Sequence, residues 1–363
     1  MGPPPRAAGG TREAATVAFD ALGAERGAEV VIEGVRQAAR DGIGVRVFGS
    51  ASELAELEAL PGVSVIDAAD AIGNREEPMR AVRSRPQASI VQAAADVAAG
   101  RSGALASPGS TGATMAAALF GMGRIRGVQR PALAVQLPAP ARKLPLLMLD
   151  VGANAEARPS HLIQFAHLGA AFAEAVLGLA SPRVALLSVG EEEKKGTPLV
   201  VEAHAALREA GTLDFAGNVE GVDLLDPPAD VVVTDGFTGN VVLKTIEGTA
   251  KAVGGAVGAA ARTGLRPAAG GLLLRPALGT LRERMDPDST GGAILLGIDG
   301  IAVVGHGSAG PVGIANQIRL AARSASVGAV ARTADLIGRS GVGRGTLRSA
   351  SRSGDAGRSP AES

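Results

Sequence analysis

The chain has 363 residues, of which 46% are hydrophobic and 20% charged, and its 36 basic and 36 acidic side chains balance. This composition is typical of a globular protein with a sizeable core, and it argues against a nucleic-acid binder, which is usually basic. The absence of Cys excludes disulfides and thiolate chemistry. Because aromatic residues make up only 2% of the chain, with no Trp or Tyr, we do not expect base-stacking platforms.

The two ends of the chain differ in composition from its middle. Residues 1–15 lack the apolar core of a signal peptide and are predicted to be a disordered leader. Gly, Ser and Arg dominate 338–363, which predicts a disordered tail. We expect 16–337 to form one α/β domain, with a division into two lobes left open. No run approaches the roughly 18 apolar residues of a membrane span, so we expect a cytoplasmic protein, at most peripherally bound to a membrane.

Short β-branched runs alternate with amphipathic segments in the first part of the chain. Strands are predicted at 16–19, 45–48, 63–66 and 103–106, and helices at 29–40, 53–60 and 87–99. Ser52 is predicted to cap the second helix, and 73–86 to be a loop with one helical turn. This alternation predicts βαβ units and a mostly parallel sheet.

The same alternation continues to the end of the domain. An Ala-rich helix to about residue 120 precedes strands at 132–135, 146–149, 183–189 and 231–234, with a short strand and loop over 215–223. Helices are predicted over 161–178 (capped by Ser160), up to about 210, and over 240–261 and 270–285. A turn and strand at 291–304 then lead into a final helix to about 331.

The turn at 107–112 (SPGSTG) is the best candidate for binding an anion. It joins a predicted strand to a helix, and a helix N-terminus offers unpaired N–H groups and a positive dipole end. Its glycines allow close backbone approach, and Ser110 and Thr111 supply hydroxyl groups beside Gly112. An ordinary βα turn with a capped helix would have the same sequence features.

A second candidate turn lies within 229–248 (ADVVVTDGFTGNVVLKTIEG), where a buried strand ends at Asp235 and a helix follows. Open α/β sheets bind ligands beyond the carboxyl ends of their strands, so Asp235, Asn240 and Lys244 are candidate site residues. We expect this turn to face 107–112 and the loop that contains Lys194 and Lys195.

Lys194 and Lys195 follow three glutamates in a glycine-framed loop after a strand, where a solvated charge run is the alternative. Asn154 and Asn218 stand at turns, which asparagine also favours for backbone reasons. His306 lies between two glycines at a helix start. The spacing of the four histidines predicts no metal site.

These motifs together resemble the PlsX family, the phosphate:acyl-ACP acyltransferases of bacterial phospholipid synthesis. The resemblance runs from about Val17 to Ile337. It rests on GSTGA at 109–113, LLMLDVGAN at 146–154, LIQFAHLG at 162–169, SVGEEEKKG at 188–196, GNVEG at 217–221, VTDGFTGNVVLKTIEG at 233–248 and GGAILLGIDGIAVVGHGS at 291–308.

The resemblance implies that phosphate attacks the thioester of a long-chain acyl carrier protein, giving acyl phosphate and free carrier without a cofactor. It implies a three-layer α/β/α sandwich related to isocitrate and isopropylmalate dehydrogenases and to phosphotransacetylases. It also implies a homodimer at the membrane periphery, whose product a membrane acyltransferase transfers to glycerol 3-phosphate.

For individual residues, the resemblance implies a phosphate cradle at Ser110, Thr111 and Gly112. Lys194 or Lys195 would supply charge to the phosphate or the oxyanion. Asp235, Asn240 and Lys244 would shape the reacting centre, and Asn154, Asn218 and His306 would make further contacts. The chain departs from the family pattern at a few positions: Leu22, Ala24, Glu25, Ala28, Pro108, Ser110, Val222 and Ala309.

The segment 270–285 has an apolar stripe, Leu274, Leu278, Leu281 and Met285, with arginines nearby and Pro276 inside it. A contact with a membrane or an acidic carrier would have this pattern, and so would a dimer-core helix.

Three other functions remain open on the sequence. A phosphotransacetylase-like enzyme would use short acyl-CoA and need a nucleotide pocket. A regulator without catalytic activity would bind the acyl carrier and consume no phosphate. A metal-dependent decarboxylating dehydrogenase would need clustered aspartates, whereas Gly239 stands where a second acid would be expected.

Overall fold

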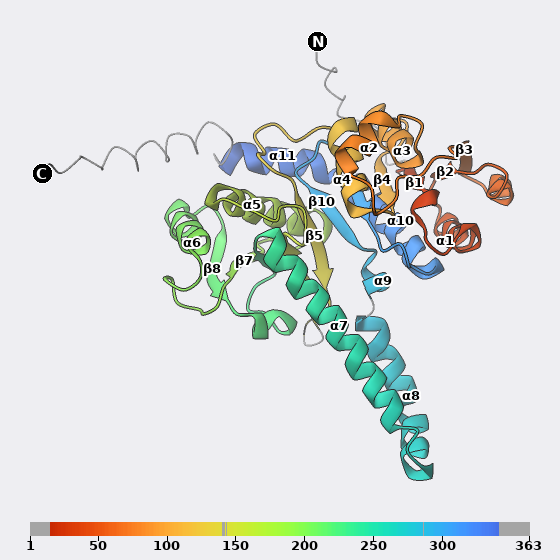
Figure 1. Cartoon of the computed structure of the whole chain (residues 1–363). Coiled ribbons are helices and arrows are strands. Elements are labelled where there is room, and N and C mark those ends of the chain that lie inside the picture. The colour runs from red at the N-terminus through yellow and green to blue at the C-terminus, as the bar shows by residue number, and fades with distance from the viewer. Residues whose placement is uncertain (1–14, 140–141, 143, 286, 341–363) are drawn as a thin grey trace, which may run out of the picture.

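The computed structural model describes residues 15–139, 142, 144–285 and 287–340. Within them, eleven strands form one continuous sheet in the order β3-β2-β1-β4-β11-β10-β5-β6-β9-β7-β8 (Figure 1). The strands in chain order are β1 (Val17–Asp20), β2 (Val45–Gly49), β3 (Val63–Asp67), β4 (Ala104–Ser107), β5 (Ala132–Leu137), β6 (Leu146–Leu149), β7 (Arg183–Leu187), β8 (Asp214–Val219), β9 (Val231–Val233), β10 (Ala293–Leu296) and β11 (Ala302–Val304).

Helices cover both faces of the sheet. One face packs against α1 (Ala28–Arg40), α5 (Pro159–Val176), α6 (Pro198–Ala210), α10 (Pro311–Ser326) and α11 (Ala329–Ser340). The other packs against α2 (Pro78–Ser84), α3 (Ser89–Ala98), α4 (Thr111–Gly121) and the first half of α7 (Gly236–Ala260). Alternate strand residues point to opposite faces, so Phe19 joins one core and Ala18 the other. The predicted three-layer α/β/α sandwich is confirmed.

Strand direction divides the sheet into two halves. β1, β2, β3, β4 and β11 are parallel to one another, and so are β6, β9, β7 and β8. Between these sets, β10 is antiparallel to both β11 and β5, and β5 is antiparallel to β6. The two sets therefore run in opposite directions. We call the edge where β1, β4 and β11 end the cradle edge, and the edge where β6, β7, β8 and β9 end the far edge.

Two predicted helix caps are wrong. The helix predicted at 53–60 is a short 3-10 helix, η2 (Ala55–Ala59), with Leu54 rather than Ser52 at its N-cap. Helix α5 begins at Pro159, because the fixed φ of proline suits the first helical position. Arg158, and not Ser160, therefore occupies the cap.

Three segments contain more structure than the sequence predicts. Within 73–86 lies the two-turn helix α2, capped by the carboxylate of Glu77. Residues 291–304 form two antiparallel strands instead of one. The final helix is two helices, separated at Gly328, whose φ is +66°. Helix α11 extends to Ser340, into the predicted tail, whereas 341–363 and 1–14 lie outside the described residues.

The second half of α7 and helix α8 (Leu265–Met285) form a hairpin that projects from the body of the molecule (Figure 1). Helix α8 continues through Pro276, and the short α9 (Pro287–Thr290) leads back to β10. Of the predicted apolar stripe, Leu274 is exposed; the side chains of Leu278, Leu281 and Met285 lie outside the described part of the chain.

Candidate functional site

The phosphate-cradle candidate lies at the cradle edge, where β4 ends and α4 begins. Ser110 is the N-cap of α4, and its Oγ accepts a hydrogen bond from the Ala113 amide at 3.4 Å. Thr111 is exposed at the first helical position. A Cβ added at Gly112 would lie 2.7 Å from Cγ of Pro78, so the approach of α2 requires glycine there. The α4 N-terminus is thus capped, solvent-facing and closely bordered by α2.

A buried carboxylate supports this turn from below. Asp20, at the end of β1, accepts hydrogen bonds from Ser89 Oγ at 2.6 Å and Ser107 Oγ at 2.8 Å. Ser107 Oγ in turn accepts from the Gly109 amide at 3.0 Å. Burial raises the pKa of Asp20, and the hydrogen bonds from the two serines partly offset this rise. Sequence reasoning did not select Asp20, although an acid at the end of a buried strand was a usable signal.

Three loops meet at the cradle edge through direct backbone contacts. The Gly305 amide donates to Ser107 O, and the Glu25 amide donates to Gly307 O, each at 2.9 Å. A Cβ at Gly23 would lie 2.5 Å from the Gly109 nitrogen, so this pair of loops touches backbone to backbone. His306 is therefore anchored beside the cradle on both sides.

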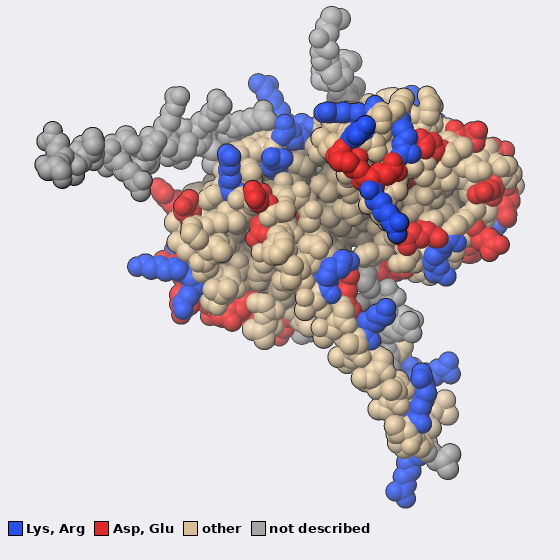
Figure 2. Space-filling model, viewed as in Figure 1, with Lys and Arg blue, Asp and Glu red and all other residues tan. Residues whose placement is uncertain are grey.

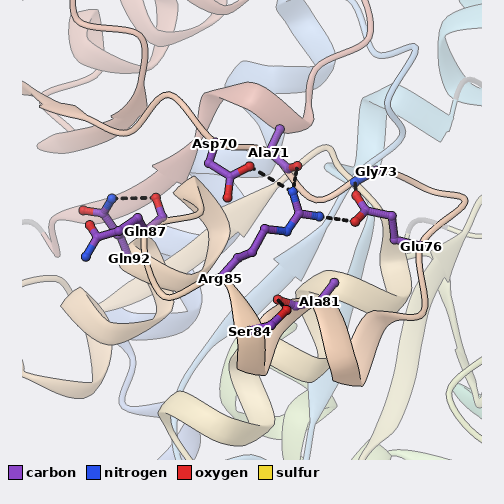
Figure 3. Close-up of polar contacts among 9 residues, drawn as sticks. All are labelled: Asp70, Ala71, Gly73, Glu76, Ala81, Ser84, Arg85, Gln87 and Gln92. Atoms are coloured by element: carbon purple, nitrogen blue, oxygen red, sulfur yellow. Dashed lines mark hydrogen bonds and ion pairs between the residues drawn. The ribbon is translucent and has the colours of Figure 1, made fainter.

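A fourth loop, 70–77, is fixed at the same edge by Arg85 (Figure 3). The Arg85 guanidinium donates to Asp70 Oδ1 at 2.9 Å and to Ala71 O at 3.0 Å, and it also pairs with Glu76. From this loop Asn74 Nδ2 lies 3.5 Å from Glu25 Oε1. Arg85 thereby fixes the loop after β3, and Asn74 connects that loop to the loop after β1.

Helix α7 brings two more charged residues to this edge. Lys244 Nζ donates to Glu247 Oε2 at 2.7 Å, and His306 Nε2 lies 3.5 Å from Glu247 Oε1. Lys244 and His306, both predicted site residues, are thus joined through Glu247, which sequence reasoning missed. A carboxylate three residues after a lysine on one helix face was the signal.

At the far edge, Asp150 organises the loop that follows β6. Its buried carboxylate accepts hydrogen bonds from the amides of Leu133, Gly152, Ala153 and Asn154, and from Asn154 Nδ2. Burial raises the pKa of Asp150, and these hydrogen bonds partly offset the rise. Asn154 Nδ2 also donates to Pro131 O at 2.8 Å, so the side-chain NH2 group of this predicted site residue has two partners within the chain.

The first turn of α7 is docked on the same loop. Asp235 caps the helix by accepting from the Thr238 amide at 2.9 Å and Thr238 Oγ1 at 2.7 Å. Asn240 Nδ2 donates to Val151 O at 3.0 Å. A Cβ at Gly239 would lie 1.9 Å from Asp150 O, so only glycine permits this approach.

The remaining candidates also lie at the far edge, in the loops after β7 and β8. Lys194 and Lys195 are both exposed, and the Lys195 carbonyl accepts from Ser188 Oγ at 3.1 Å. Asn218 is buried; its Nδ2 donates to Glu192 O, and its Oδ1 lies 2.9 Å from His204 Nδ1. Asn218 therefore helps to fix the loop that contains Lys194 and Lys195, through its hydrogen bond to the backbone of that loop.

The predicted site residues thus fall into two groups. Ser110, Thr111, Gly112, Lys244 and His306 converge at the cradle edge. The others lie at or near the far edge: Asn154, Lys194, Lys195, Asn218, Asp235 and Asn240. The expectation that the Asp235 turn faces 107–112 is wrong within one chain, because β9 and β4 run in opposite directions.

The cradle edge has features of an anion site: a helix N-terminus, the loop of His306 beside it, and the ammonium group of Lys244, which Glu247 connects to His306. Among the described residues, no group of three His, Asp or Glu side chains is arranged to hold a metal ion. The described helices include none that is long and apolar enough to cross a bilayer.

Comparison with known proteins identifies the family. The family model described as fatty acid synthesis protein matches residues 15–332. The phosphate acyltransferase of Elusimicrobium minutum is 43% identical over 321 residues, covering 86% of this chain and 93% of that protein. A phosphate acyltransferase of Thermus thermophilus is 44% identical over 318 residues, covering 87% and 96%. The chain belongs to the PlsX family. This confirms the family and the enzyme class, an acyltransferase, that the motifs predict.

Solved structures more distant than the PlsX family share the fold. A phosphotransacetylase from Streptococcus pyogenes superposes with a TM-score of 0.56 at 16% identity, covering 86% of this chain and 94% of that one. A branched-chain phosphotransacylase from Enterococcus faecalis V583 has the same TM-score at 18% identity, covering 86% and 99%. The predicted relation to the phosphotransacetylase fold is confirmed.

Proposed function

We propose that the chain transfers the acyl group of a long-chain acyl carrier protein to inorganic phosphate, feeding glycerophospholipid synthesis. A phosphate oxygen attacks the thioester carbonyl, the carbon–sulfur bond breaks, and the carrier leaves as a thiolate that takes up a proton. The observation that carries this proposal is the convergence of the α4 N-terminus, Lys244 and His306 at the cradle edge, in a member of the PlsX family.

The proposed reaction requires the protein mainly to position the two reactants and to stabilise negative charge. Phosphate is itself a nucleophile at neutral pH, and a thiol with a pKa of about 8.5 is an adequate leaving group. In this proposal the amides and hydroxyls at Ser110, Thr111 and Gly112 hold phosphate, while Lys244 and His306 offset its charge and that of the tetrahedral oxyanion. No covalent enzyme intermediate is required.

The far-edge residues take supporting roles in the same proposal. Asp235 and Asn240 set the start of the helix that carries Lys244, and Asn154 holds the loop on which that helix rests. Lys194 and Lys195 supply charge from an exposed loop shaped by Asn218. Exposed ammonium groups suit the recognition of an acidic carrier surface or of phosphate.

Two surfaces support further partners. Exposed apolar side chains gather in the loops after β7 and β8 and in the first turns of α7, which supports a homodimer through the far edge; they are Val189, Val222, Leu225, Phe237 and Val241.

The projecting hairpin exposes Leu272, Leu273 and Leu274 beside Arg275. Basic side chains stand among uncharged ones on the face of the hairpin shown in Figure 2. This supports a peripheral membrane contact, where a membrane acyltransferase would receive the acyl phosphate.

Incubation with acyl-carrier thioester and phosphate, followed by mass spectrometry of the products, tests the proposed reaction. We expect acyl phosphate and free carrier in equal amounts, and none without phosphate. Product formation only from short acyl-CoA would instead indicate a phosphotransacetylase-like enzyme. No product from either thioester would favour a carrier-binding regulator.

A further inference from the structure

Helix α7 carries a single carboxylate, and its position among charged neighbours is unusual. Glu247 is the only acidic residue between 236 and 260. It follows Lys244 by three residues, a spacing that puts the two side chains on one helix face, and its Oε2 accepts from Lys244 Nζ at 2.7 Å. The remaining carboxylate oxygen, Oε1, is buried and accepts no hydrogen bond from the described residues.

The second charged partner of Glu247 comes from a distant part of the sequence. His306 Nε2 lies 3.5 Å from Oε1, and His306 follows β11 at the cradle edge. The backbone on either side of His306 is fixed by Ser107 O and by the Glu25 amide. Glu247 is therefore the link between α7 and the loop beside the cradle.

The charges around this link favour an ionised carboxylate. Burial raises the pKa of Glu247, but the neighbouring His306 and Lys244 outweigh burial and hold this pKa below its usual value. Oε2 accepts the hydrogen bond from Lys244, and Oε1 faces His306 Nε2 at 3.5 Å. The carboxylate of Glu25 packs beside Gly307, the residue after His306.

The three side chains differ in their exposure. Lys244 is 53% exposed and His306 42%, whereas Glu247 is only 21% exposed. An anion approaching from solvent therefore meets the ammonium group of Lys244 and the imidazole of His306 before it meets the carboxylate. Without Glu247, two flexible groups that can both carry positive charge would repel each other.

We propose that Glu247 is a positioning residue, which holds Lys244 and His306 together beside the cradle so that they can receive an anionic substrate. The identity of that anion, inorganic phosphate, rests on the proposed function. In this role Glu247 itself contacts neither substrate nor reacting atoms. It acts through the side chains of Lys244 and His306.

Glu247→Gln tests the role of the charge, because glutamine keeps the size of the side chain. Glu247→Asp keeps the charge on a shorter stem, and Glu202→Gln, on an exposed position of α6, is the matched control. Phosphate binding to the full chain is measured by calorimetry. We expect Glu247→Gln to weaken it about tenfold, with partial recovery in Glu247→Asp and no change in Glu202→Gln.

An NMR titration of the histidine rings provides a readout that a purely structural role would not move. The His306 signal is assigned by its loss in His306→Asn. On addition of phosphate, we expect the His306 ring signal to shift in wild type and in Glu202→Gln, and to shift several-fold less in Glu247→Gln, because the imidazole is no longer held beside Lys244.

In a folded Glu247→Gln protein, a wild-type response of the His306 signal to phosphate or a wild-type phosphate affinity would overturn the inference, as would a wild-type chain that binds no phosphate. Both measurements are independent of acyl transfer. If phosphate binding responds as expected while the chain forms no acyl phosphate, the proposed reaction fails and the positioning role stands.

Discussion

At the scale of single residues, two buried carboxylates organise the two edges of the sheet. Asp20 joins two serine hydroxyls below the cradle, and Asp150 gathers four backbone amides and one asparagine at the far edge. Asp20 ends β1 and Asp150 follows β6, as the sequence predicts, but Ser107, a partner of Asp20, lies 87 residues away from it. Spacing along the chain contains no record of such partners, which is why the sequence could not predict their role.

Asp20 should make stability depend on pH. Its pKa is raised by burial above 3.8, so just above pH 3.8 the folded chain binds a proton more tightly than the unfolded chain. Stability is then lost as pH rises through the folded-state pKa. Asp20→Asn, which mimics the protonated carboxyl, should remove this loss in urea unfolding measured from pH 4 upward. The exposed Asp226→Asn is the control; identical pH slopes in both variants and wild type would contradict the expectation.

Lys195 and Asn240 test the contribution of the far edge to the reaction. Separate changes to Ala should each lower the rate of acyl phosphate formation at least about tenfold, because each removes a polar group from the proposed site or its support. Circular dichroism melting checks that both variants stay folded. Near-native rates in both would remove the far-edge residues from the proposed site.

At the scale of elements, the predicted strands and helices largely match the structure, because β-branched runs and apolar periodicity report local burial. The direction of the strands, in contrast, does not follow from these local patterns. Nothing in 231–233 or 104–107 states that the two strands run oppositely, since this depends on how β5, β6 and β10 pair. The sequence therefore predicted the elements on which Ser110 and Asp235 stand but not the edges at which they lie.

Two glycines of α7 should respond oppositely to the same substitution. Gly239→Ala drives a Cβ into Asp150 O and should lower the free energy of unfolding by at least about 2 kcal/mol. Gly248→Ala meets no atom within 4 Å and should raise it by about 0.5–1 kcal/mol, because alanine favours the helix. Denaturant unfolding measures both. Equal effects would show that α7 does not rest on the Asp150 loop.

The projecting hairpin should mediate membrane contact through its leucines. In flotation with liposomes that contain anionic lipid, wild type should bind, and Leu274→Glu should bind several-fold less because a charge replaces an inserted apolar side chain. Val312→Glu makes the same change at an exposed position on α10 and should behave as wild type. Absence of binding by every protein, wild type included, would dismiss the membrane contact.

At the scale of the whole molecule, the far edge combines exposed apolar side chains with loops that are fixed by hydrogen bonds of the buried side chains of Asp150 and Asn218. Phe237 and Val241 stand one turn apart on α7, and Val189 and Val222 follow the neighbouring strands β7 and β8. Such a patch is costly on an isolated chain in water, so its burial against a second copy is the expected arrangement.

Light scattering after size-exclusion chromatography tests this association. Wild type should elute as a dimer, and Phe237→Asp should shift the population to monomer, because an unpaired charge in the interface opposes its burial. Leu273→Asp, the same type of change at an exposed apolar position on the hairpin, should remain dimeric. A monomeric wild type would rule out the far edge as a dimer surface.

Helix α7 starts on the Asp150 loop at one edge of the sheet and reaches His306 at the other. An α-helix resists compression along its axis, and each residue advances it by about 1.5 Å. A displacement of its first turn therefore moves Lys244 and Glu247 by the same amount. Helix α7 thus connects the two edges of the sheet mechanically. A partner that docks against Phe237 and Val241 at the far edge would displace the helix, and with it the charged side chains of Lys244 and Glu247 beside the cradle.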